Sequence, residues 1–143
     1  MEKNEIIEIL QASLATEIIC VLRYRNHYYV ASGSDSLPIA DEFLKHSDDE
    51  FQHMNQLAQR IIELDGKPNM NPSEIHKISH VDYVPGSNLI AMIKDNLSAE
   101  LIAVAAYTDA IQKIGGSDPT TRVLLESILA KEEEHKSDLQ ALL

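Results

Sequence analysis

The chain has 143 residues and a formal net charge of −11, which results from 12 basic and 23 acidic side chains. This length suits one domain with a substantial core and is short for two. The acidic surface argues against a nucleic-acid partner, whose phosphates it would repel, and favours the attraction of cations. The single cysteine, Cys20, excludes both an internal disulfide and a metal site made of four cysteines.

No targeting or membrane segment is recognisable in the sequence. The N-terminal residues lack the basic segment and apolar stretch of a secretory signal. The longest apolar runs, such as residues 101–106, are far shorter than a membrane span. We therefore expect a soluble cytoplasmic protein without a membrane partner.

Apolar residues recur at three- and four-residue spacings in the first half of the chain, which predicts two long helices. The first covers roughly residues 4–32 and ends before Gly33. The second covers residues 38–65 and ends at the segment 65–68, Asp-Gly-Lys-Pro, because glycine suits the left-handed position after a helix and proline cannot extend it.

Two more helices are predicted in the second half. One covers residues 87–114, with Ser87 as its cap and two glycines at its end. The other covers residues 119–142, with Asp118 as its cap and a proline in the first helical position. The irregular segment 66–86 is long enough to cross the length of a bundle. An all-α, antiparallel four-helix bundle with one long crossover is therefore expected, as a single domain over residues 1–143.

An internal repeat supports this interpretation. Residues 14–24 and 97–107 share Leu, Glu, Ile, Val and Tyr at matching positions. The central glutamates of the repeat, Glu17 and Glu100, each lie in the middle of an apolar helix face. A buried carboxylate is costly unless it is protonated, paired or bound to a metal, so two at equivalent positions indicate a common ligand.

Each half of the repeat also contains a Glu-x-x-His pair at nearly the same distance downstream. Residues three apart on a helix point to the same side, so each pair can reach one metal ion. Four carboxylates and two neutral imidazoles balance two divalent cations, and such a ligand set suits iron or manganese. The candidate catalytic and metal-binding residues are Glu17, Glu50, His53, Glu100, Glu132 and His135.

Each part of the pattern, taken alone, has an explanation that needs no metal. A single Glu-x-x-His pair arises often by chance, and the acidic run 132–134 by itself is typical of a solvated helix face. The conjunction of two pairs, two interior glutamates and matching spacings favours a di-metal centre over a structural four-helix module that binds nothing.

With these residues the sequence resembles the bacterioferritin branch of the ferritin-like superfamily along essentially its whole length. The resemblance is carried by the candidate ligands, by residues 50–53 and 132–135, and by residues 64–69 after the second helix. It implies a ferritin-like bundle with an intrasubunit di-iron centre. Glu17 and Glu100 would be terminal ligands, Glu50 and Glu132 would bridge the two metals, and His53 and His135 would each bind one metal.

The resemblance also assigns a role to Tyr24. It matches a tyrosine beside the di-iron centre of bacterioferritins, where it could hydrogen-bond a ligand or supply an electron; the alternative is an ordinary core tyrosine. Tyr107, its equivalent in the repeat, is a weaker candidate. Cys20 is interpreted as a small core residue. The histidines outside the two pairs are interpreted as surface or capping residues; these are His27, His46, His76 and His80.

Three departures from the bacterioferritin pattern affect cofactors and assembly. Phe51 replaces the methionine that ligates haem, so haem is not expected. The chain ends eight residues after His135, so no fifth helix is expected. The crossover 66–86 is longer than usual, which brings the chain nearer to bacterioferritin-like mini-ferritins that assemble like Dps proteins. In addition to these three departures, the inner-surface iron site of bacterioferritins is incomplete, because Lys45 stands where a histidine is expected beside Asp49.

Our functional hypothesis is a cytoplasmic ferroxidase for iron storage or detoxification, which oxidises Fe(II) with O2 or H2O2 at two iron ions per subunit. The alternative is a di-iron or di-manganese peroxidase or catalase without storage. The expected partner of the chain is itself, as a homo-oligomer built from dimers, and the missing helix favours a cage of twelve subunits over twenty-four. Closed symmetry is the usual form of such assemblies.

Overall fold

Five helices make up the fold in the computed structural model, which describes residues 1–143 and contains no strand. Four of the helices are long and one is short. In chain order they are α1 (Lys3–Val30), α2 (Ser36–Glu63), α3 (Pro72–Ile78), α4 (Leu89–Ile114) and α5 (Pro119–Ala141). None of them combines the length and the apolar character that a bilayer-spanning helix requires.

The presence of α3 corrects the expectation of a bundle with no fifth helix. This helix lies in the crossover, within a segment that the sequence analysis interpreted as irregular. Its start is stabilised because the Asn71 side chain accepts a hydrogen bond from the Ser73 backbone N–H at 3.0 Å. Pro72 occupies the first turn, where its missing N–H costs nothing. Ile75 is buried with Ala15 of α1, so tertiary packing holds the short helix in place.

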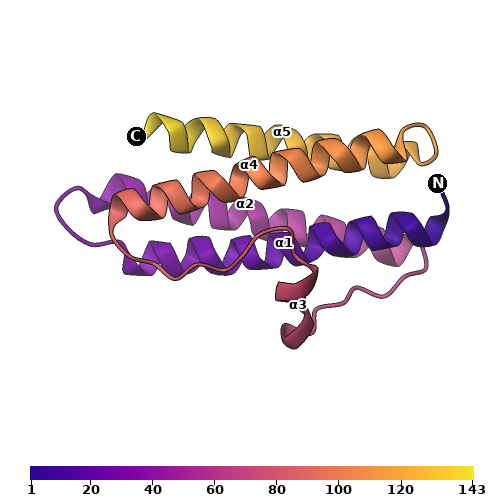
Figure 1. Cartoon of the computed structure of the whole chain (residues 1–143), viewed down its shortest axis with the longest axis horizontal. Coiled ribbons are helices and arrows are strands. Elements are labelled where there is room, and N and C mark those ends of the chain that lie inside the picture. The colour runs from indigo at the N-terminus through magenta and orange to yellow at the C-terminus, as the bar shows by residue number, and fades with distance from the viewer.

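The four long helices form two antiparallel pairs, α1 with α2 and α4 with α5 (Figure 1). The crossover carries the chain from the end of α2 back along the molecule to the start of α4, and α3 lies on it beside α1 (Figure 1). As a result α2 and α4 run in the same direction. At 28 residues, α1 is about 42 Å long, enough to span the whole bundle.

The helix ends show which terminal signals operate in the folded chain. Asn88, and not Ser87, caps α4, accepting a hydrogen bond from the Ala91 N–H at 2.9 Å. Asp118 caps α5 as expected, accepting from the Thr121 N–H at 3.0 Å. After α2 it is Asp65, with φ of 65°, that takes the left-handed conformation.

Gly66 is needed at the end of α2 for a different reason from the expected one. A Cβ atom at this position would lie 2.9 Å from Ile61 Cγ2. The glycine therefore permits a close approach of the chain to α2.

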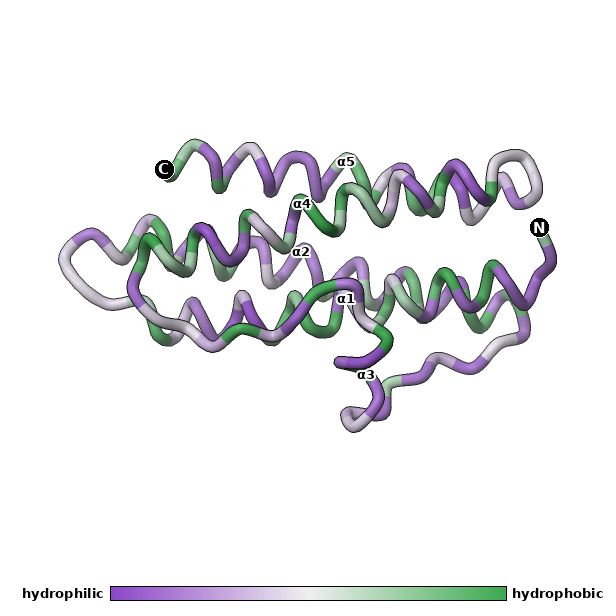
Figure 2. The backbone as a smooth tube through the Cα atoms, in the orientation of Figure 1, coloured by the Kyte–Doolittle hydropathy of each residue, from purple (hydrophilic) through white to green (hydrophobic).

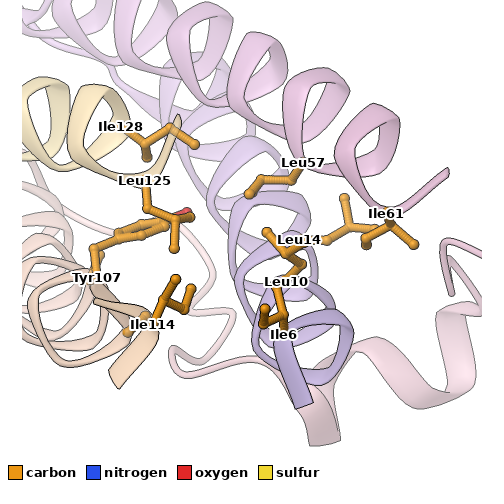
Figure 3. Close-up of a cluster of buried hydrophobic side chains, with 11 residues drawn as sticks. Ile6, Leu10, Leu14, Leu57, Ile61, Tyr107, Ile114, Leu125 and Ile128 are labelled. Carbon is orange, nitrogen blue, oxygen red and sulfur yellow. The ribbon is translucent and has the colours of Figure 1, made fainter. Parts of the chain in front are cut away.

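Two of the three apolar clusters fill the interior at different heights of the bundle. Figure 3 shows the larger, in which side chains of α1, α2, α4 and α5 point toward one another. A second cluster contains Tyr24, Phe43, Met92, Ile93 and Leu139. Along every long helix the candidate metal ligands fall between the residues of these two clusters. Polar positions therefore interrupt the hydrophobic ones along the helices, as Figure 2 shows for the backbone.

Candidate metal centre

The six candidate ligands, which come from four different helices, converge in the interior of the bundle. They form two overlapping groups whose ligand atoms lie within 4.8 Å of one another. Glu50 and Glu132 belong to both groups. The first group adds Glu17 and His53, and the second adds Glu100 and His135.

The two histidines point their Nδ1 atoms at the carboxylates. His53 Nδ1 lies 3.1 Å from Glu132 Oε1 and 3.6 Å from Glu17 Oε2. His135 Nδ1 lies 3.4 Å from Glu100 Oε1. Both rings approach Glu50 Oε1, at 3.4 Å and 3.3 Å respectively. Glu50 therefore lies between the two imidazoles.

The ligand atoms are buried without conventional partners. All six residues are buried, and each contributes at least one nitrogen or oxygen atom that has no hydrogen-bond partner. Both carboxylate oxygens of Glu50 and of Glu132 are in this condition. Burying polar atoms in this way is costly unless something binds them. Oxygen and imidazole donors clustered at this spacing fit a pair of divalent transition-metal ions.

When no metal is present, the electrostatic environment of the centre favours protonation of its histidines and of two of its glutamates. Burial lowers the pKa of His53, but the nearby carboxylates of Glu132 and Glu17 raise it more, to about 9. The pKa of His135 is raised to about 9 by Glu100 in the same way, against the effect of burial. Burial and the neighbouring carboxylates raise the pKa values of Glu50 and Glu132 well above the ordinary value. Divalent cations would compete with these protons for the same atoms.

Two tyrosines contact the outer carboxylates, which are the glutamates that belong to only one of the two groups. The contacts cross between α1 and α4. Tyr24 Oη on α1 donates to Glu100 Oε1 on α4 at 2.6 Å, and Tyr107 Oη on α4 donates to Glu17 Oε1 on α1 at 2.6 Å. Both tyrosines are buried. From the sequence Tyr107 is the weaker candidate, whereas in the structure its contact with the centre is equivalent to that of Tyr24.

Asp49 gives His135 a second contact outside the centre. His135 Nε2 lies 2.9 Å from Asp49 Oδ2, a distance at which the ring N–H donates to the carboxylate. That contact leaves the Nδ1 lone pair directed at the other ligands. From the sequence, Asp49 was considered only for an inner-surface iron site. Its contact with His135 was not predicted, because helical spacing does not show which residue of another helix lies beside it. His46 stacks on the same ring, with centroids 3.9 Å apart.

The interpretation of His27 and His46 as surface or capping residues is wrong, because both side chains are fully buried. His27 lies in a buried chain of polar contacts. Arg23 Nε donates to Asn96 Oδ1 at 2.7 Å, and the Asn96 side-chain amide contacts His27 Nδ1 at 2.9 Å. The other two histidines, His76 and His80, are exposed.

Cys20 and Phe51, also singled out from the sequence, belong to neither group of candidate ligands. Cys20 is buried, as expected of a small core residue, with its sulfur 3.6 Å from Arg23 Nη2. Phe51 is 45% exposed on α2, next in sequence to the buried Glu50.

Comparisons with known proteins agree with this architecture. The sequence model of the Ferritin family, described as a ferritin-like domain, matches residues 7–143. The chain is 29% identical to a bacterioferritin of Streptomyces coelicolor, in an alignment that covers 97% of this chain and 80% of the relative. It is 26% identical to a nutrient stress-induced DNA-binding protein of Synechococcus, covering 92% of this chain and 76% of that protein.

A solved structure extends the likeness to three dimensions. The bacterioferritin-related protein of Bacteroides fragilis, described as a dodecameric thioferritin, matches with a TM-score of 0.94 and 29% identity. The match covers 99% of this chain and 85% of that one. By its family match, its relatives and its fold, the chain is a bacterioferritin-like member of the ferritin family.

Proposed function

We propose that this protein is a ferroxidase that binds two Fe(II) ions per subunit as substrates, for iron storage or detoxification. The observation that carries the proposal is the set of buried, partnerless nitrogen and oxygen atoms, every one of the six residues contributing. Four carboxylates supply four negative charges, which two divalent ions neutralise when the histidines are uncharged. Family membership supports an iron-related role.

Each residue has a distinct proposed task. Glu50 and Glu132 belong to both groups and would bridge the two ions. Glu17 with His53 would complete one coordination sphere, and Glu100 with His135 the other. The apolar clusters above and below the centre exclude bulk water and hold the four helices at a fixed separation.

The residues around the centre would orient the ligands. Bound Fe(II) supplies the electrons, one from each ion, that reduce O2 or H2O2. Tyr24 and Tyr107 keep the outer carboxylates oriented through their hydrogen bonds. Asp49 holds His135 in the tautomer whose Nδ1 lone pair faces the metal position. Tyr24 is also our candidate for supplying an additional electron.

A matched pair of α5 variants tests the proposal. In Glu132→Gln a bridging carboxylate becomes an amide of the same size, whereas Glu133→Gln changes an exposed neighbour. We expect anaerobically loaded wild type and Glu133→Gln to oxidise Fe(II) rapidly when O2 or H2O2 is added, and Glu132→Gln to show only the rate of buffer. Equal rates in all three proteins would refute the proposal.

The stability of the metal-free protein separates loss of the centre from loss of the fold. Removing one of four crowded buried carboxylates relieves repulsion, so metal-free Glu132→Gln should unfold at the same or a higher denaturant concentration than wild type. Metal analysis of the purified protein tests the manganese alternative, because a manganese enzyme would retain manganese and fail to oxidise Fe(II).

We further propose that residues 1–143 act as one domain and assemble into a homo-oligomeric cage. The support is the likeness to a protein described as dodecameric. Twelve subunits of 16.0 kDa would have a mass of about 190 kDa, and closed symmetry is the usual form of homo-oligomers. Light scattering after gel filtration would contradict the cage if it gave the mass of a monomer or dimer.

A further inference from the structure

A second type of polar cluster lies outside the six ligands, on the side of the bundle formed by α2 and α5. Glu42 and His46 come from α2, and Asp138 comes from α5. One potential ligand atom from each lies within 4.8 Å of the others. None of these residues belongs to the two groups that form the central site.

The distances within the cluster match those between neighbouring ligands of one metal ion. His46 Nε2 lies 3.0 Å from Glu42 Oε1 and 3.3 Å from Asp138 Oδ2. Metal–ligand bonds of about 2.0–2.2 Å place adjacent ligands about 3.0–3.5 Å apart. The single hydrogen that Nε2 carries cannot be donated fully to both carboxylates, whereas one cation can be bound by all three side chains.

Burial and charge also favour a cation at this place. The His46 side chain is fully buried, and its Nδ1 has no partner, so all polar contacts of the ring are directed at the two carboxylates. The Glu42 and Asp138 side chains are 26% and 33% exposed, which leaves room for solvent to complete a coordination sphere. No lysine or arginine forms an ion pair with either carboxylate.

The cluster adjoins the central site without sharing a ligand with it. The His46 ring stacks on the His135 ring at 3.9 Å, with an angle of 22° between their planes. His135 points Nδ1 into the centre, whereas His46 points Nε2 toward the partly exposed Glu42 and Asp138. A cation at the cluster would therefore sit between solvent and the buried centre.

We propose that Glu42, His46 and Asp138 bind a third divalent transition-metal ion per subunit, separate from the central pair. One imidazole nitrogen and two carboxylate oxygens suit Fe(II), Mn(II) and Zn(II) better than metals that prefer sulfur ligands. Water would occupy the remaining positions on the exposed side. The site is defined by its own three residues, so its occupancy does not depend on the oxidation chemistry proposed above.

The test counts Zn(II) ions bound by the full-length protein, because zinc is not oxidised. Metal-free wild type should bind three ions per subunit in a calorimetric titration, checked by metal analysis after gel filtration. The variant Glu42→Gln/Asp138→Asn should bind two, its affinity for the third falling more than about 100-fold, because two ligands are lost. Asp41→Asn, which changes an exposed carboxylate on the same helix, should still bind three.

A third protein separates this proposal from the central site. Glu132→Gln should weaken binding of the central pair and retain the ion at the cluster, which anomalous diffraction at the zinc edge would locate beside His46. Circular dichroism verifies that each variant keeps its helices, and the single variant Glu42→Gln gives the same readout with a smaller change. The proposal is overturned if wild type binds only two ions, or if Glu42→Gln/Asp138→Asn retains the third.

Discussion

The two halves of the central site have the same candidate ligands and different surroundings. One half consists of Glu17, His53 and the supporting Tyr107, and the other consists of Glu100, His135 and Tyr24. In each half a tyrosine donates a hydrogen bond of 2.6 Å to the outer glutamate. The internal sequence repeat accounts for this equivalence, because equal spacings on similar helices produce equal geometry.

The two halves differ in the residues that contact the side of each histidine ring facing away from the centre. His135 is held between Asp49 and the stacked ring of His46, and its side chain is 1% exposed. The His53 side chain is 8% exposed, and its polar contacts are all with carboxylates of the centre. The two repeated sets of candidate ligands thus differ: the half with His135 is firmly oriented, and the half with His53 is more accessible.

The two tyrosines also differ in the side chains that pack around them. Tyr24 packs against the rings of Phe43 and His46 and lies below the Arg23 guanidinium, whose Cζ is 5.3 Å from the ring centroid. Tyr107 belongs to the mainly aliphatic cluster shown in Figure 3. The local repeat therefore places the candidate ligands, whereas the non-repeated neighbours determine how accessible and how rigid each half is.

The largest expected effect comes from removing one histidine from either half. His53→Ala and His135→Ala should each slow the first phase of Fe(II) oxidation more than about 100-fold, because each removes a proposed ligand. Added imidazole should restore part of the rate only in His53→Ala, since that position is the more exposed. Stopped-flow absorbance measures both rates, and equal rescue in the two variants would contradict the assigned asymmetry.

The pH dependence tests what the two halves share. Both histidines have a pKa of about 9 in the metal-free fold, above the ordinary 6.5. Their stabilising contribution is therefore complete below pH 6.5 and is lost as the pH rises through about 9. Denaturant unfolding of the metal-free protein should show falling stability over this range, while Zn(II) affinity of the centre rises.

The variants provide the control for this titration. In metal-free His53→Ala or His135→Ala the loss of stability between pH 6.5 and 9 should be smaller than in wild type, since one of the two histidines with a raised pKa has been removed. A stability curve as steep as that of wild type in both variants would show that other groups cause the titration.

A smaller effect is expected from the contact behind His135. Asp49→Asn replaces a charged acceptor with a neutral one, and loss of such support costs about 10–100-fold in metal affinity. Asp48→Asn is the matched control, because Asp48 is exposed and pairs with Arg25 at 2.9 Å. Zn(II) titration should show one weakened central ion in Asp49→Asn and none in Asp48→Asn; two weakened ions would argue against a role confined to one half.

The smallest effects on metal binding should come from the tyrosines. Tyr24→Phe and Tyr107→Phe each remove one hydrogen bond to a buried carboxylate, which contributes about 1.5–3 kcal/mol to stability. Chemical unfolding of the metal-free proteins should show similar losses. If Tyr24 supplies an electron, freeze-quenched samples should lose a tyrosyl radical signal in Tyr24→Phe and keep it in Tyr107→Phe. Identical radical signals in the two variants would leave Tyr24 with only an orienting role.

Much of the centre could be predicted because its signals are local. Helical periodicity places residues three or four apart on one face, so the two Glu-x-x-His pairs and the interior glutamates Glu17 and Glu100 were recognisable without a structure. Matching offsets in the two halves of the chain added the expectation that they meet. Tyr24, two turns after Glu17, was singled out by the resemblance to bacterioferritins and not by periodicity.

What escaped prediction depends on partners distant in the sequence. The segment that contains α3 is rich in proline and asparagine, so its sequence alone indicates an irregular structure. The helix forms because Ile75 packs with Ala15 of α1, a contact that the sequence does not show. His27 and Arg23 are linked through Asn96 on α4. His46 is buried against His135 on α5. Composition and spacing do not show which polar side chain another helix will cover.

Helix geometry repeats every 3.6 residues, so the helical class and the pairing of the candidate ligands along each helix could be predicted from the sequence. The crossing of Tyr24 and Tyr107 to the opposite glutamates became visible only in the folded chain, as did the placement of Asp49 and His46 around one histidine while the other stays partly accessible. The reason is physical: contacts between helices depend on how the helices pack, and a side chain's burial and orientation exist only once its neighbours are in place.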